Sequence, residues 1–145
     1  MANWDERFHE MALLVASWSK DTNTKVGAVI VDQDNIVMSM GYNGFPRGCD
    51  DSIESRYERP MKYMFTEHAE RNAIYQAGRH GVSLKNSTMY VTMFPCADCA
   101  RAIIQSGITR LVVPNPDINH PKWGEDFKIA IIMLEEAKVK INFLR

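Results

Sequence analysis

The sequence lacks long apolar runs and has almost no excess charge. No uninterrupted apolar stretch approaches the ~20 residues that a membrane-spanning helix needs. The formal net charge is −1 over 145 residues, whereas proteins that bind polynucleotides usually carry a basic face. We therefore expect a protein that neither spans a membrane nor binds a polynucleotide.

The N-terminus lacks a recognisable targeting signal. Residues 1–20 mix acidic and basic side chains before their apolar part, without the basic start and small-residue cleavage site of a secretory signal. No repeat, low-complexity segment or flexible linker interrupts the chain, and its length fits one domain. With 46% hydrophobic and 24% charged residues, the composition is that of a globular protein. We expect a single cytoplasmic domain spanning residues 1–145.

Cysteine is scarce, with three residues in the chain. The count is odd, and Cys96 and Cys99 are separated by only two residues. In a chain without a secretion signal, this pattern favours metal or redox chemistry over a disulfide framework. Cys49 has no companion cysteine near it, so we expect it to be an unliganded thiol.

Helical and strand patterns alternate along the chain. Helical periodicity marks residues 4–19, 66–77, 95–107 and 126–138, and apolar or alternating runs typical of strands mark 26–32, 36–42, 87–93, 109–113 and 139–144. The irregular segments 43–60 and 114–125 are long enough to be functional. This order predicts a three-layer α/β/α domain with a mixed, roughly five-stranded central sheet.

Two fragments that each open a predicted helix carry a metal-binding pattern: TEHAERNAI (66–74) and FPCADCARAI (94–103). His68, Cys96 and Cys99 supply one imidazole and two thiolates, a set that binds zinc tetrahedrally and leaves the fourth position for water. The Cys-x-x-Cys spacing places both sulfurs on one side of a first helical turn, where the helix dipole favours thiolates. We expect one catalytic zinc ion per chain, with Glu70 beside it.

Two other interpretations of these fragments are weaker. A structural zinc site would need a fourth protein ligand, which could come only from Cys49 or from one of the remaining histidines, His9, His80 and His120. A redox pair would sit in a thioredoxin-like βαβ pattern and would not need the upstream His-Ala-Glu.

The pattern H-x-E followed by P-C-x-x-C is the signature of zinc deaminases, and the chain resembles the deoxycytidylate (dCMP) deaminases of the cytidine/deoxycytidylate deaminase superfamily. The resemblance runs from about residue 8 to residue 113 and rests on SKDTNTKVGAVIV (19–31), GYNGFPRGC (41–49), HAERNAI (68–74) and STMYVTMFPCADCARAIIQSGI (87–108). It implies zinc-dependent hydrolysis of dCMP to dUMP and ammonia, with Glu70 transferring the protons.

The resemblance also assigns residues to the substrate. It implies that Asn43 contacts the sugar or base, and that Thr24 and Lys25 meet the phosphate. The backbone amide of Ala69, at a helix N-terminus, is expected to bind the pyrimidine carbonyl, and Phe94 to form a wall of the pocket. Ordinary structural roles stay open for these positions: a turn asparagine, a solvated lysine and a packed aromatic ring.

Regulation and assembly are implied by the same resemblance. Many relatives are homohexamers that dCTP activates and dTTP inhibits. Tyr42, Asn43, Gly44 and Arg47 lie in a segment that resembles the effector-binding loop, and a triphosphate effector would bring Mg²⁺. We expect a homo-oligomer, either a hexamer or a dimer.

The segment PNPDINHPKWGEDF (114–127) departs from the dCMP deaminase pattern. Relatives typically carry a tyrosine here that helps hold the substrate phosphate, and this segment has none. His120 or Lys122 could meet a phosphate instead, and Trp123 could stack on the base.

Other substrates therefore stay open: dCTP, a free nucleoside or base, or a modified pyrimidine or purine nucleotide. The near-zero net charge disfavours a tRNA or single-strand DNA deaminase. The intact Glu70 disfavours a non-catalytic nucleotide-sensing zinc module, since a sensor needs no group that transfers protons.

Overall fold

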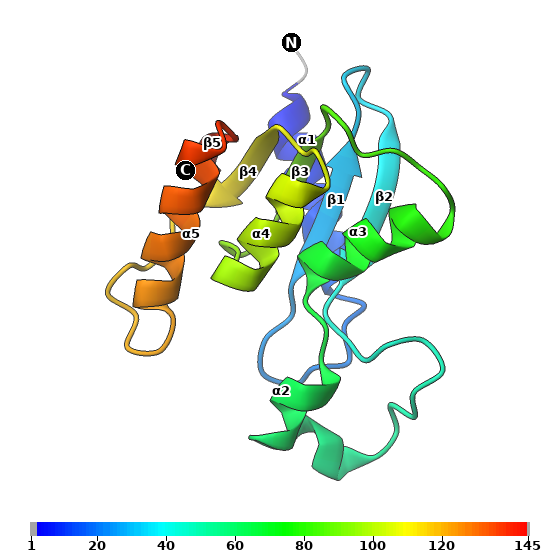
Figure 1. Cartoon of the computed structure of the whole chain (residues 1–145). Helices are drawn as coiled ribbons and strands as arrows, with labels where there is room; N and C mark the ends of the chain where they lie inside the picture. Colours follow the sequence, from blue (N-terminus) through cyan, green and yellow to red (C-terminus); the bar gives the residue numbers. More distant parts are fainter. Residues whose placement is uncertain (1–2, 145) are drawn as a thin grey trace.

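The computed structural model describes residues 3–144 as one mixed five-stranded sheet with helices on both faces (Figure 1). In chain order the elements are α1 (Trp4–Ala16), β1 (Gly27–Val31), β2 (Val37–Tyr42), the 3₁₀ turn η1 (Glu54–Tyr57), α2 (Met61–Phe65), α3 (Ala69–Arg79), β3 (Thr88–Val91), α4 (Ala97–Gln105), β4 (Arg110–Pro114), α5 (Gly124–Glu136) and β5 (Lys140–Leu144). The strand order is β2-β1-β3-β4-β5. β1 runs antiparallel to β2 and β3, while β3, β4 and β5 are parallel. The predicted fold class is confirmed.

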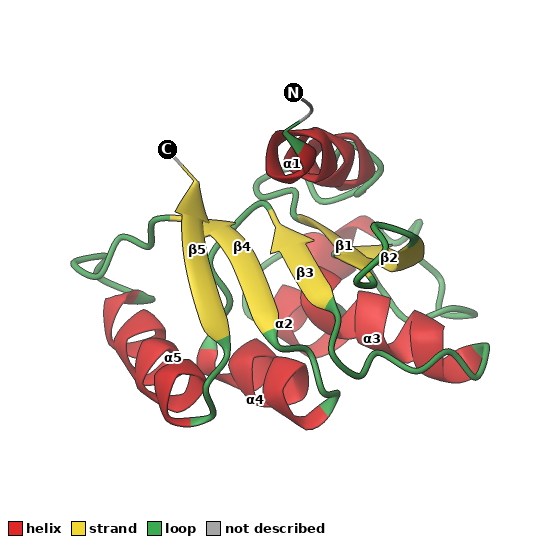
Figure 2. Ribbon diagram, turned by 90° about the horizontal axis from the view of Figure 1, so that it is seen from above, coloured by secondary structure: helices red, strands yellow, loops and turns green. Residues whose placement is uncertain are grey.

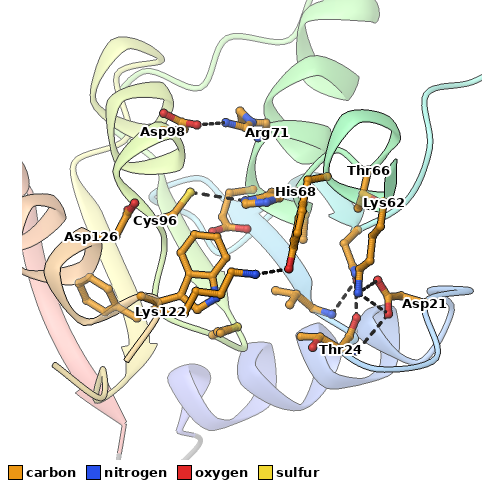
Figure 3. Close-up of a pocket in the computed structure, with 18 of the residues that line it drawn as sticks. Asp21, Thr24, Lys62, Thr66, His68, Arg71, Cys96, Asp98, Lys122 and Asp126 are labelled. Atoms are coloured by element: carbon orange, nitrogen blue, oxygen red, sulfur yellow. Dashed lines mark hydrogen bonds and ion pairs between the residues drawn. The ribbon is translucent and has the colours of Figure 1, made fainter. Parts of the chain in front are cut away.

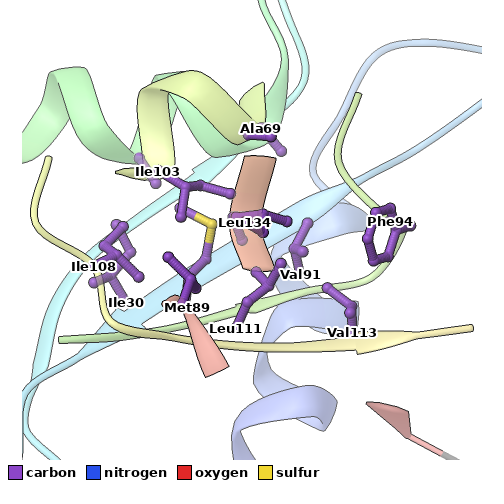
Figure 4. Packing of buried hydrophobic residues seen from close by; sticks show 14 of the residues in the cluster. Ile30, Ala69, Met89, Val91, Phe94, Ile103, Ile108, Leu111, Val113 and Leu134 are labelled. Atoms are coloured by element: carbon purple, nitrogen blue, oxygen red, sulfur yellow. The ribbon is translucent and has the colours of Figure 1, made fainter. Parts of the chain in front are cut away.

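The helices cover the two faces of the sheet unequally. α1 lies alone on one face, and α3, α4 and α5 lie on the other (Figure 2). Alternate residues of each strand point to opposite layers, so Val29 and Val31 of β1 pack with α1, and Ala28 and Ile30 pack toward α3 and α4. Figure 4 shows Ile30 together with Ala69 and Ile103 in the second of these clusters. Because both faces of β1 are buried, its sequence is continuously apolar.

The segment between β2 and α3 is more ordered than its sequence indicates. It contains η1 and the short helix α2, neither of which is long enough to show a hydrophobic period. Tertiary contacts hold them instead. The ring of Phe45 stacks on Tyr57 with centroids 4.7 Å apart and packs against Phe65 at 5.4 Å.

None of the helices in residues 3–144 has both the length and the hydropathy that crossing a bilayer requires.

Small residues allow α3 to lie directly against β2. Ala69, Ala73 and Ala77 repeat at four-residue spacing on the buried face of α3. A Cβ atom at Gly41 of β2 would lie 2.4 Å from the Ala73 nitrogen, so only glycine fits at this position. The Ser39 hydroxyl also donates a hydrogen bond of 2.6 Å to the Ala73 carbonyl. These contacts fix the position of the α3 N-terminus relative to the sheet.

An ion pair fastens α1 to the sheet. Asp5 Oδ2 accepts a hydrogen bond of 2.6 Å from Arg110 Nη2, and Asp5 Oδ1 accepts one of 2.7 Å from the Tyr90 hydroxyl. Arg110 Nε donates to Asn142 Oδ1 at 2.8 Å, so one guanidinium links α1 to β4 and β5. The hydrogen bond from Arg110 holds the pKa of Asp5 below its ordinary value.

We expect Asp5→Asn to lower the free energy of unfolding at pH 7 by about 1 kcal/mol, the value of a partly exposed charged hydrogen bond. The folded-state pKa of Asp5 is depressed, so this contribution exists above the unfolded pKa near 4 and is lost as the pH falls through the folded pKa. Chemical denaturation between pH 7 and pH 3 would measure it, with Glu6→Gln as the exposed neighbouring control. A difference between Asp5→Asn and the parent that is independent of pH would contradict this account.

Candidate active site

The N-termini of α3 and α4 meet beside the end of β3. His68 is the N-cap residue of α3, Cys96 is the N-cap residue of α4, and Cys99 lies in the first turn of α4. His68 Nδ1 lies 3.5 Å from Cys96 Sγ and 3.3 Å from Cys99 Sγ, and the three ligand atoms lie within 4.8 Å of one another. Zinc with tetrahedral bonds of about 2.1 Å to nitrogen and 2.3 Å to sulfur separates such atoms by about 3.6 Å. The three residues therefore fit zinc.

The ligand group stops at three residues. Within residues 3–144, no further histidine, cysteine or carboxylate joins it, and Cys49 is an exposed free thiol. Because a structural zinc site usually has four protein ligands, this arrangement favours a catalytic ion with one open position.

Hydrogen bonding shifts the pKa values of the two cysteine ligands in opposite directions. The hydrogen bond from the Cys99 thiol, together with the contact to His68, lowers the pKa of Cys96 to about 4. The same bond to Cys96, followed by burial, raises the pKa of Cys99. The hydrogen bonds thus shift Cys96 toward the thiolate, which is the form that ligates metal.

Glu70 lies beside the ligands without joining them. It is the second residue of α3, and its side chain is buried with 4% exposure. Burial raises the pKa of Glu70 to about 6. A carboxyl group that titrates near neutral pH is suited to accept and return protons.

The ligand group and Glu70 line a cavity of about 400 Å³ (Figure 3). Apolar contacts come from Val26, Met93, Phe94, Trp123 and Phe127, and polar ones from Asp21, Thr24, Asn43, Arg59, Lys62, Tyr63, Thr66, Arg71, Asp98, Lys122 and Asp126. The lining therefore joins segments from five regions of the chain: the segment before β1, the end of β2, the α2–α3 region, the β3–α4 turn and the start of α5.

Most of the substrate residues expected from the sequence reach this cavity. Thr24, Asn43, Ala69, Phe94 and Trp123 all line it. The N-cap residue of α3, His68, makes no side-chain cap hydrogen bond, and Ala69 at the first position of the helix lines the cavity.

Lys25 is exposed and does not line the cavity in the described part of the chain. The residues expected in the effector-binding loop do not all line the same cavity. Tyr42 and Gly44 line a second, smaller cavity of about 90 Å³. Arg47 lines neither cavity, and its guanidinium donates a hydrogen bond to Gln76.

Asn43 also has a structural task. Its Oδ1 accepts a hydrogen bond of 2.8 Å from the Val26 amide, and its Nδ2 donates one of 2.8 Å to the Thr24 carbonyl. An asparagine side chain has two N–H donors, so one donor stays available to a ligand. The same amide therefore shapes the cavity wall and can contact a substrate.

Two side-chain pairs in the cavity give no signal in the sequence. Lys62 Nζ lies 2.9 Å from Asp21 Oδ2, and the two side chains are 10% and 6% exposed. Lys122, just before α5, donates a hydrogen bond to the hydroxyl of Tyr63, which lies in α2. Charged residues in short or irregular segments have no periodicity, so only the folded chain reveals these pairs.

Comparisons with known proteins all return deaminases. Residues 2–114 match the family model described as the cytidine and deoxycytidylate deaminase zinc-binding region. The chain is 43% identical over 145 residues to an uncharacterised deaminase encoded in the luxG 3′ region of Aliivibrio fischeri, covering 99% of this chain and 95% of that protein. It is 40% identical over 114 residues to human deoxycytidylate deaminase, covering 75% of this chain and 63% of the human protein.

Phage proteins also match over most of their length. The deoxycytidylate deaminase of phage T4 is 35% identical over 176 residues, with 93% of this chain and 91% of the phage protein covered. The crystal structure of dCMP deaminase from the cyanophage S-TIM5 in complex with dCMP and dUMP gives a TM-score of 0.77 at 25% identity, covering 96% of this chain and 95% of that one.

We expect Glu70→Gln to reduce turnover by about 10²- to 10⁴-fold, because the amide cannot accept a proton. Zinc content should stay at the parent level, since Glu70 is outside the ligand group. Ammonia release and metal analysis would measure the two properties, with the exposed Glu135→Gln as control. Loss of zinc together with activity would instead make Glu70 a ligand.

Proposed function

The chain belongs to the cytidine and deoxycytidylate deaminase family and is a zinc-dependent hydrolytic deaminase, and we propose that it converts dCMP to dUMP and ammonia. One observation carries the proposal: the His68, Cys96 and Cys99 group shares its cavity with a buried Glu70 and with cationic side chains that suit a phosphate. Named relatives that act on deoxycytidylate support this choice of substrate.

In the proposed reaction, the oxygen of water forms a bond to C4 of the pyrimidine, and the C4–N bond to the amino group breaks. His68, Cys96 and Cys99 would hold zinc, which would supply Lewis-acid activation of water near neutral pH. Glu70 accepts a proton from the attacking water and delivers it to ring nitrogen N3. It then accepts the remaining proton of the new C4 hydroxyl and delivers it to the amino group, which leaves as ammonia. The Ala69 amide donates to the pyrimidine carbonyl, and Asn43 uses its remaining N–H on the sugar or base.

The phosphate is assigned to cationic residues that carboxylates do not neutralise. Lys62 is paired with Asp21. By contrast, Arg59 and Lys122 line the cavity and form no salt bridge within the described residues. The Lys122 ammonium lies 4.0 Å from the centroid of the Tyr63 ring. These two side chains support binding of a 5′-phosphate, where charge-assisted hydrogen bonds are strongest.

Thr24 adds a hydroxyl group to the same cavity, whereas Lys25 lies outside it. We therefore assign the phosphate to Thr24, Arg59 and Lys122. Trp123 and Phe94 form apolar walls against which the base can stack.

Regulation and assembly remain predictions. The cavity lined by Tyr42, Asn43 and Gly44 supports a nucleotide effector, with Mg²⁺ if that effector is a triphosphate. Its volume of about 90 Å³ is smaller than the roughly 300 Å³ of typical ligand pockets. A complete effector site would therefore need surface from a second subunit, in keeping with the proposed cytoplasmic homo-oligomer.

An ammonia-release panel tests the substrate: dCMP, CMP, dCTP, deoxycytidine, cytosine, dAMP and dGMP at equal concentration. We expect dCMP to exceed deoxycytidine by about 10- to 100-fold in kcat/KM, because the nucleoside lacks the charge-assisted contacts to the phosphate. Faster turnover of another member would move the substrate to that compound. No turnover of any member by protein with bound zinc would favour the nucleotide-sensing module.

Replacing Lys122 tests the phosphate assignment. Lys122→Gln is expected to raise KM for dCMP about tenfold and to leave kcat/KM for deoxycytidine unchanged, since only the nucleotide carries the phosphate. Lys128→Gln, on the exposed part of α5, is the matched control. An equal loss for nucleotide and nucleoside would contradict a phosphate role.

A further inference from the structure

The first turn of α4 carries two metal ligands and lacks a cap of its own. A helix N-terminus is usually capped by a Ser, Thr, Asp or Asn side chain that accepts a hydrogen bond from an amide of the first turn. Here the N-cap residue is Cys96, whose side chain makes no such bond. Its sulfur instead faces His68. Cys96 therefore gives the Ala97 amide no acceptor from its own side chain.

Asp126, in the first turn of α5, supplies an acceptor from a different element. Its Oδ1 accepts a hydrogen bond from the backbone N–H of Ala97, the first residue of α4. Figure 3 shows the Asp126 carboxyl group beside Cys96. Phe94 and Phe127 lie close to Ala97 and Asp126 in the sequence, and their rings pack edge-on with centroids 5.8 Å apart.

The segment that presents Asp126 is internally braced. His120 Nδ1 accepts hydrogen bonds of 3.0 Å from the Lys122 amide and 3.1 Å from the Trp123 amide. The Gly124 amide donates to the His120 carbonyl at 2.9 Å, and a Cβ atom at Gly124 would lie 2.4 Å from the Ile118 carbonyl oxygen. Lys122 and Trp123 line the cavity, and Asp126 connects their segment to the turn that carries Cys96.

We propose that Asp126 is a positioning residue for the metal centre. Its carboxylate caps α4 from α5 and fixes the peptide between Cys96 and Ala97, which holds Cys96 Sγ in place relative to His68 and Cys99. A carboxylate is favoured at this position because the helix N-terminus carries partial positive charge and the hydrogen bond is charge-assisted. The proposal rests on the zinc assignment and is independent of which nucleotide is the substrate.

The first test measures zinc affinity by competition with a chromophoric chelator. Asp126→Ala should weaken zinc binding by about 10- to 100-fold, the usual effect of losing a group that orients a ligand. It should also shift the sulfur-to-metal bands of the Co²⁺-substituted protein. Asp126→Asn keeps an oxygen acceptor and should restore most of the affinity. Glu125→Ala, next to it and exposed, should match the parent.

The second test removes the donor instead of the acceptor. Ala97→Pro deletes the amide hydrogen at the first helical position, where proline is tolerated. Cys96 has φ −71° and ψ 173°, which is compatible with a following proline. Ala97→Pro should therefore reproduce the loss of zinc affinity seen in Asp126→Ala. In the double variant the two losses should not add, because they remove one interaction.

A lower melting temperature in Asp126→Ala, with zinc affinity and cobalt spectrum as in the parent, would overturn the proposal and leave Asp126 a purely structural residue. If Asp126→Ala does not fold, Asp126→Asn and Ala97→Pro decide by the same two measurements. Failure of the parent to deaminate dCMP while binding zinc normally would refute the proposed substrate and leave this inference intact.

Discussion

Three ligand atoms within 4.8 Å of one another require two helix N-termini to meet, and much of the domain serves that contact. α3 reaches the position by lying flat on β2, which its alanine stripe and Gly41 permit. α4 reaches it because the turn after β3 leads directly into Cys96. A shift of about 1 Å in either helix would separate the ligands, so the close packing of α3 on β2 bears directly on the chemistry.

The opposite wall of the cavity is held by polar contacts instead of apolar packing. Asp21 accepts hydrogen bonds from the Asn23 and Thr24 amides at 2.9 and 3.1 Å and pairs with Lys62. Asn43 holds the next part of the same segment through Val26. Burying an ion pair costs desolvation energy that hydrogen bonds must offset. In return, the wall is fixed before a substrate arrives, which reduces the reorganisation needed during the reaction.

The segment after β4 joins two tasks that are separate in the sequence. It lacks the tyrosine that the resemblance led us to expect, and it instead places Lys122 and Trp123 at the cavity. The same segment places Asp126 on the amide that follows Cys96. A change in this segment can therefore alter both the contacts to a nucleotide and the geometry of the metal ligands, which makes it a natural place for substrate preference to diverge.

Short-range spacing was enough to nominate His68, Glu70, Cys96 and Cys99, because the chemistry of each fragment depends on residues within one helical turn of each other. Periodicity likewise predicted the strands, the long helices and the layered fold, since burial on one or both faces leaves a regular apolar pattern. The sequence could not reveal Arg59, Lys62 or Asp126 as cavity residues: α2 is too short to show a period, and an acidic residue in the first turn of α5 looks like ordinary helix chemistry. Only the packing of segments that lie far apart in the chain decided which charges share the cavity and which carboxylate caps α4.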